Sequence, residues 1–226
     1  IKMKHFVWIV SFVLVVVLCA IYSFRLQKQL NVANESILRY GQESALMHNS
    51  VQNIINCRKM EAQSEGFRLS PDVIVTNTKG DISPLVDIIT TPTLVYRFTE
   101  MHCNSCIEHG LRLLKETCSS TKLPVMVLCR YESIRLVRAV SNSYGIEFPI
   151  YNISERLSFP LDDMSTSYFF IIDENLKCHG FQSFIKEVPI ITETDLNGLC
   201  SAQLKEIEYV GGIVNRSDAE DKIKMV

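Results

Sequence analysis

The chain has 226 residues, and its 23 lysines and arginines against 25 aspartates and glutamates give a formal net charge of −2. This balance provides no basic field of the kind that binds nucleic acid. Charged residues make up 21% of the chain and apolar residues 47%, which excludes a disordered chain. The length fits one globular domain with appended segments.

Residues 6–24 form a run of 19 residues without a charge. A helix of that length is about 28 Å long, close to the thickness of a hydrocarbon core, and its apolar residues lie all round the helix. The sequence therefore predicts that residues 1–24 form a short tail and a single transmembrane signal anchor over 6–24. A cleaved signal peptide is the alternative, because Lys2 and Lys4 precede the run.

Residues 25–65 contain no proline, one glycine and many helix-forming residues, which predicts a helical stalk over residues 25–66. Gly41 is the expected break if the stalk consists of two helices. Apolar residues recur at spacings of three, four or seven with gaps, so a spacer is a better interpretation than a coiled coil. Cys57 could cross-link two copies, and self-association through the stalk remains possible.

Residues 67–210 alternate between short apolar runs and amphipathic segments, a pattern typical of strands and helices in an α/β domain. We expect a mixed central sheet flanked by helices, followed by a disordered tail over residues 211–226. The expected strands are 72–77, 92–98, 124–129, 148–151, 168–172 and 177–183, with a short strand or turn at 82–87, and the expected helices are 107–116, 133–143 and 194–208.

Two cysteines stand where the strand at 92–98 gives way to a helix, in the order Cys103-Asn104-Ser105-Cys106. Two intervening residues place both sulfurs within disulfide reach in the first helical turn. The first thiol then lies over unpaired backbone N–H groups, where the helix dipole favours a thiolate. The second thiol can attack a mixed disulfide and release the product. The spacing predicts thiol–disulfide exchange, with Cys103 attacking and Cys106 resolving.

Two other interpretations of the motif stay open at this point: a structural metal site and a pair of inert thiols. A metal site would need two further ligands, and the chain has no second CxxC or HxxxH to supply them. The available candidates are His102, His109, Cys178 and His179. Three further cysteines lie in or near predicted core elements and are expected to be small buried apolar residues, namely Cys118, Cys129 and Cys200.

Residues 67–208 resemble a thioredoxin-like domain, and more narrowly the membrane-anchored bacterial thiol–disulfide oxidoreductases of the TlpA-like kind. The resemblance is carried by residues 73–83, by residues 94–98 followed by the CxxC motif, by Phe148-Pro149 and by residues 168–173. It implies an enzyme that exchanges a Cys103–Cys106 disulfide with protein thiols and needs no other cofactor. It also implies a domain that is held outside the cytoplasm, in the bacterial periplasm.

The chain departs from that family at three places. His102 replaces an aromatic residue before the first cysteine, where a cationic imidazole could stabilise a thiolate and Glu100 would oppose it. The residues between the cysteines are not the usual Gly-Pro. Ser167, after Thr166, stands where the family has the cis-proline that shapes the substrate groove, and we expect a trans bond there.

The missing proline keeps a second class of function open. In that alternative the chain is a redox-inactive or sensory thioredoxin-like module that holds a partner at the membrane.

Overall fold

The computed structural model describes residues 2–118, 123–185 and 188–202, with the side chains of residues 2–13, Val15 and Cys118 outside the description. The predicted disordered tail over 211–226, the end of the last predicted helix and the environment of Cys118 therefore lie outside the described residues. The chain divides into two compact units, Ile1–Asn53 and Ile54–Val226.

The first helix, α1 (Lys2–Ser64), is 63 residues long. Gly41, the expected break, lies inside it without interrupting it. Among the described residues, we find no helix that combines the length and the apolar character required to cross a bilayer. Much of the predicted anchor, residues 6–13 and 15, has side chains outside the description, so the anchor stays a prediction.

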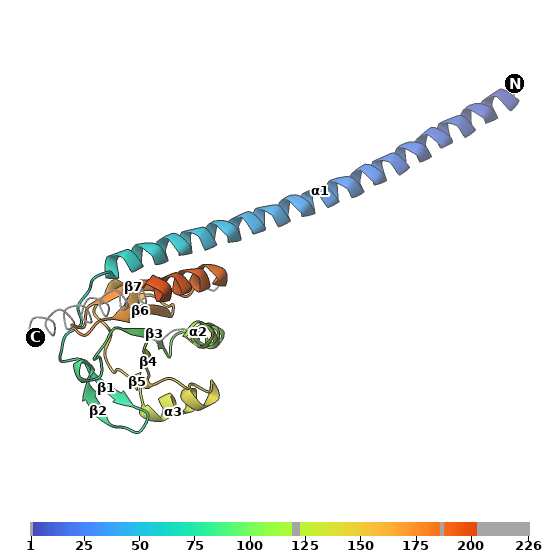
Figure 1. The fold of residues 1–226 in the computed structure, drawn as a ribbon. Coiled ribbons are helices and arrows are strands. Elements are labelled where there is room, and N and C mark those ends of the chain that lie inside the picture. Colours follow the sequence, from blue (N-terminus) through green and yellow to red (C-terminus); the bar gives the residue numbers. More distant parts are fainter. Residues whose placement is uncertain (1, 119–122, 186–187, 203–226) are drawn as a thin grey trace, which may run out of the picture. The chain divides into compact units, whose positions relative to one another are not determined.

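The second unit is built on a sheet that has seven strands within the described residues, in the order β2-β1-β5-β4-β3-β6-β7 (Figure 1). The strand pairs β3–β4 and β4–β5 are parallel, and the remaining pairs are antiparallel. The sheet therefore is mixed, as predicted. The strands are β1 (Ile74–Asn77), β2 (Ile82–Pro84), β3 (Thr93–Thr99), β4 (Val125–Arg130), β5 (Ile150–Asn152), β6 (Tyr168–Ile172) and β7 (Cys178–Ser183).

Helices and short 3₁₀ turns flank the sheet. They are α2 (Asn104–Cys118), α3 (Ile134–Ser143), a helix over residues 189–202, and the 3₁₀ turns η1 (Leu85–Asp87) and η2 (Pro160–Asp163). Every residue of β3 and β6 is buried, which explains why their sequences read as continuous apolar runs. A mixed central sheet flanked by helices is the fold class predicted from the sequence.

Alternate residues of β3 serve two separate cores, because successive side chains of a strand point to opposite faces. Leu94, Tyr96 and Phe98 pack in one cluster with apolar residues of α2, α3 and the helix at 189–202. Val95 packs in the other, with residues around both 3₁₀ turns. The junction of β3 and α2 is therefore fixed by a packed core on each face of the sheet.

The end of α1 docks on the edge strand β7. Carboxylate oxygens of Glu61 and Glu65 accept the backbone N–H groups of Ser183 at 2.7 Å and of Gly180 at 3.0 Å. These contacts satisfy donors that an edge strand would otherwise expose. Cys57 is only 2% exposed, so its thiol is not accessible for the cross-link between two copies that the sequence left possible.

Candidate functional site

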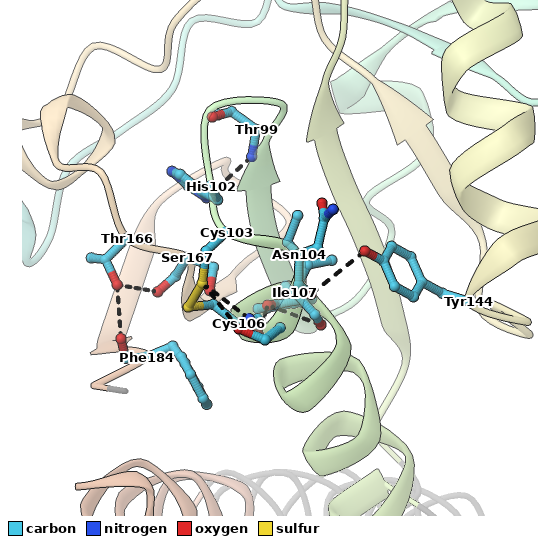
Figure 2. The surroundings of a disulfide bond; sticks show 12 residues. Thr99, His102, Cys103, Asn104, Cys106, Ile107, Tyr144, Thr166, Ser167 and Phe184 are labelled. Atoms are coloured by element: carbon cyan, nitrogen blue, oxygen red, sulfur yellow. Dashed lines mark hydrogen bonds between the residues drawn. A yellow bond between two sulfur atoms is a disulfide. The ribbon is translucent and has the colours of Figure 1, made fainter. Parts of the chain in front are cut away.

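The Cys103–Cys106 pair forms a disulfide at the junction of β3 and α2 (Figure 2). Strand β3 ends at Thr99, a short turn follows, and α2 begins at Asn104. The two Cα atoms lie 5.3 Å apart. Cys103 is exposed, while Cys106 is partly buried one turn further along. The structure thus places the two predicted site cysteines together and makes the first the accessible one.

Cys103 occupies the N-cap position of α2. Its carbonyl oxygen accepts the N–H groups of Cys106 at 3.0 Å and Ile107 at 3.1 Å, and its sulfur faces the Cys106 N–H at 3.2 Å. In this position a side-chain acceptor takes one of the otherwise unpaired donors of the first helical turn. A thiolate on Cys103 would gain a backbone donor and the positive end of the helix dipole.

Tyr96 joins the cysteine helix to β6. Its hydroxyl lies 3.4 Å from the carbonyl oxygen of Cys106. Its ring stacks on Phe169, with centroids 4.6 Å apart. A Cβ added at Gly110 would collide with the Tyr96 ring, so α2 can approach β3 this closely only with glycine there. Sequence analysis missed this tyrosine, although a hydroxyl inside an apolar strand signals a buried partner.

Thr166 and Ser167 lie on the side of the disulfide opposite Tyr144 (Figure 2). Ser167 is fully buried and its peptide bonds are trans, as a residue other than proline predicts. The Ser167 carbonyl accepts the Phe184 N–H at 2.8 Å, and the Thr166 hydroxyl donates to the Phe184 carbonyl at 2.7 Å. The segment expected to border a substrate groove is therefore tied to the chain beyond β7.

His102 is buried, and its Nδ1 accepts the Thr99 N–H at 3.2 Å, which leaves the proton of the neutral ring on Nε2. Burial, and then the positive charge of Arg97, lower the pKa of His102 to about 4. The imidazole is consequently neutral at pH 7, so the cationic support for a Cys103 thiolate expected from this residue is absent there. Glu100 lies exposed at the turn after β3.

A buried ion pair lies behind this turn. Arg97 Nε and Nη2 donate to the two carboxylate oxygens of Asp162 at 3.0 and 3.3 Å, and the side chains are 0% and 2% exposed. The carboxylate also accepts the Tyr168 hydroxyl at 2.6 Å and the Leu157 N–H at 2.8 Å. Burial alone would raise the pKa of Asp162, but Arg97 and these donors outweigh it and lower the pKa.

The pair was not found from the sequence. An arginine within a buried strand demands a partner, because an isolated charge is too costly to bury. The sequence of β3 therefore indicates that Arg97 has a partner, but it does not identify the carboxylate that forms the pair.

The other described cysteines of the sheet-containing unit are buried, as predicted for Cys129 and Cys200. Burial raises the pKa of the Cys129 and Cys178 thiols to about 12, and also raises that of Cys200. Such thiols are poor nucleophiles near neutral pH. Across the described ranges, no group of three or more His, Cys, Asp or Glu side chains is arranged to hold a metal ion.

Comparison with known proteins gives no assignment from sequence: no protein-family model matches the chain, and no curated protein matches it. Solved structures are similar to part of the chain. Peroxiredoxin Q from Xanthomonas campestris is 15% identical with a TM-score of 0.47, over 60% of this chain and 97% of that one. A secreted disulfide oxidoreductase from Mycobacterium tuberculosis is 11% identical with a TM-score of 0.41, over 58% and 96%. Similarity at this level does not support a functional assignment. The function proposed below is therefore argued from the site itself.

Proposed function

We propose that the chain is a thiol–disulfide oxidoreductase that exchanges its Cys103–Cys106 disulfide with the thiols of protein clients. The observation that carries the proposal is the exposed Cys103 sulfur at the N-terminus of α2, facing the Cys106 N–H at 3.2 Å. This placement favours the thiolate that attacks and leaves during exchange.

The proposed exchange has two steps. In the reduced protein, the Cys103 thiolate attacks one sulfur of a client disulfide, and a mixed disulfide forms as the client's other sulfur leaves as a thiolate. Cys106 then gives up its proton to solvent and attacks the Cys103 sulfur, which releases the client as a dithiol. Two electrons pass to the client, and the cysteine pair is oxidised. The reverse sequence oxidises a client, and the difference in reduction potential decides the direction.

We further propose that residues 6–24 tether the domain to a membrane and that residues 25 onward lie outside the cytoplasm, in the bacterial periplasm. The support is the uncharged run of 19 residues, whose length as a helix is close to the thickness of a hydrocarbon core. Disulfides also persist in that compartment.

A second candidate is a redox-inactive or sensory module that holds a partner at the membrane. The observation that favours it is Ser167, which is buried and carries a trans bond where the resemblance implies a cis-proline facing the disulfide.

Turnover distinguishes the two candidates. We expect the full chain, supplied with dithiothreitol, to accelerate the reduction of insulin disulfides, and Cys103→Ser to abolish the acceleration. Cys129→Ser is the matched control, because it removes a buried thiol in the neighbouring strand and should leave the rate unchanged. Equal rates for the wild type and Cys103→Ser would favour the module.

A further inference from the structure

Part of α1 presents an apolar stripe that no described side chain covers. Every described side chain from Val16 to Asn49 is exposed. The large apolar side chains of the stripe are between 46% and 72% exposed, namely Leu26, Leu30, Ile37, Tyr40, Met47 and Val51. All of them belong to the first unit, Ile1–Asn53, and none belongs to the unit that contains the sheet. Exposed apolar surface on this scale is typical of an interaction site.

The stripe follows a continuous heptad pattern. Starting at Leu26, the positions alternate in steps of four and three, and this spacing places them along one seam of a helix that pairs with another. Sequence analysis found gaps because it counted only the strongest apolar residues and allowed a break at Gly41. The helix continues through Gly41, and four further residues fill the gaps. The complete seam is Leu26, Leu30, Ala33, Ile37, Tyr40, Ser44, Met47 and Val51.

We propose that this seam binds the same seam of a second copy, so that residues 26–51 form a parallel, in-register, two-stranded coiled coil about 39 Å long. In the heptad, Leu30, Ile37, Ser44 and Val51 occupy the a positions, and Leu26, Ala33, Tyr40 and Met47 the d positions. Two of the four a positions, Ile37 and Val51, are β-branched, and such residues at a favour two strands in a parallel arrangement. The proposal does not depend on the redox function.

Charge complementarity supports an identical partner. The e and g positions that border the seam are Gln27, Gln29, Asn34, Ser36, Gly41, Glu43, His48 and Ser50. Glu43 is the only carboxylate among them, and in a parallel pair it faces His48 of the other copy across the g–e′ contact. No like charges oppose one another, so nothing at the seam repels a second copy.

A lipid surface is a poorer fit. Helices that lie on membranes line their polar face with lysine and arginine. Between residues 29 and 51 the helix has one such residue, Arg39. If residues 26–51 bound a membrane as a single helix, the proposal would be wrong.

Self-association is tested by the mass of the full chain in detergent. Light scattering measures this mass, and the contribution of the bound detergent is subtracted. Ile37 and Leu38 are neighbours, and both are 67% exposed, but only Ile37 lies on the seam. We expect the wild type and Leu38→Lys to have the mass of two chains, and Ile37→Lys to fall to half that mass. Circular dichroism checks that both variants keep their helix content. A wild type of one-chain mass, or equal masses for the two variants, would overturn the proposal.

Cross-linking tests the register. In a Cys19→Ser background, which removes an exposed thiol of the same helix, Ser44→Cys places a thiol on the seam and Ala45→Cys places one beside it. With the Cys103–Cys106 pair kept oxidised, copper phenanthroline should link Ser44→Cys chains into dimers and leave Ala45→Cys chains single. Equal yields from the two variants, or a chain that binds liposomes as a monomer through this helix, would overturn the parallel seam.

Discussion

Acidification should destabilise the sheet-containing unit through His102. Burial and the charge of Arg97 lower the pKa of His102 to about 4 in the folded state, whereas an unfolded histidine has a pKa of about 6.5. Between these values the unfolded chain binds more protons than the folded one, so the free energy of unfolding falls as pH falls.

The magnitude follows from the two pKa values. One pKa unit corresponds to about 1.36 kcal/mol, so protonation of the unfolded chain at pH 4.5 lowers its free energy by roughly 3 kcal/mol. Slight protonation of the folded state at pH 4.5, and of the unfolded state already at pH 7, makes the net loss a little smaller. The expected loss of stability between pH 7 and pH 4.5 is therefore about 2–3 kcal/mol. Asp162, whose pKa is lowered from its ordinary value, contributes its own loss only at more acidic pH.

Urea unfolding of the detergent-solubilised chain, followed by near-ultraviolet circular dichroism of the aromatic core, measures this loss. His102→Gln cannot be protonated in this range, so its unfolding free energy should change by about 2–3 kcal/mol less than that of the wild type. His109→Gln removes a partly exposed histidine of α2 and should keep the wild-type dependence. Parallel pH dependences for the wild type and His102→Gln would refute the reasoning.

Three further predictions concern the ion pair, the contact between α2 and β3, and thiol reactivity. Asp162→Asn leaves the Arg97 charge buried without a counter-charge and should lower the unfolding free energy by about 3–5 kcal/mol. The control is Asp163→Asn, which removes an exposed pair with Arg156 and should change the unfolding free energy by less than about 1 kcal/mol. Gly110→Ala drives a Cβ into the Tyr96 ring and should cost about 1–3 kcal/mol. Gly198→Ala places its Cβ where no described atom lies near it and should not destabilise the protein. Urea unfolding measures all four variants. Brief iodoacetamide treatment of the reduced protein should modify Cys103 before Cys106, Cys129 or Cys200, and mass spectrometry showing a different first site would contradict the assigned roles.

Patterns that depend on near neighbours in the chain were predicted well. The apolar runs at 92–98, 124–129 and 168–172 became strands, because burial on both faces of a sheet selects continuous apolar sequence. The CxxC motif was placed correctly at a strand-to-helix junction, since both the spacing and the capping geometry are local. These features needed no knowledge of the tertiary arrangement.

Features that depend on distant pairs could not be predicted in the same way. Arg97 meets Asp162 across 65 positions, and Glu61 meets the Ser183 N–H across 122. The neutral state of His102 follows from its burial first and from the charge of Arg97 second. Both depend on the tertiary arrangement, which is why a cationic ring was expected and a neutral one is found. Sequence spacing limits which residues share an element, but sheet order decides which elements meet.

Trapping of a mixed disulfide tests the proposed exchange most directly. In Cys106→Ser the resolving thiol is gone, so a client attacked by Cys103 stays covalently bound. We expect this variant, incubated with a disulfide-containing protein such as oxidised insulin, to yield a higher-mass adduct. Dithiothreitol should cleave the adduct, and peptide mapping should assign the linkage to Cys103. Cys103→Ser, which keeps only the partly buried thiol, should yield none. Absence of the Cys103 adduct, or equal adducts from both variants, would contradict the account.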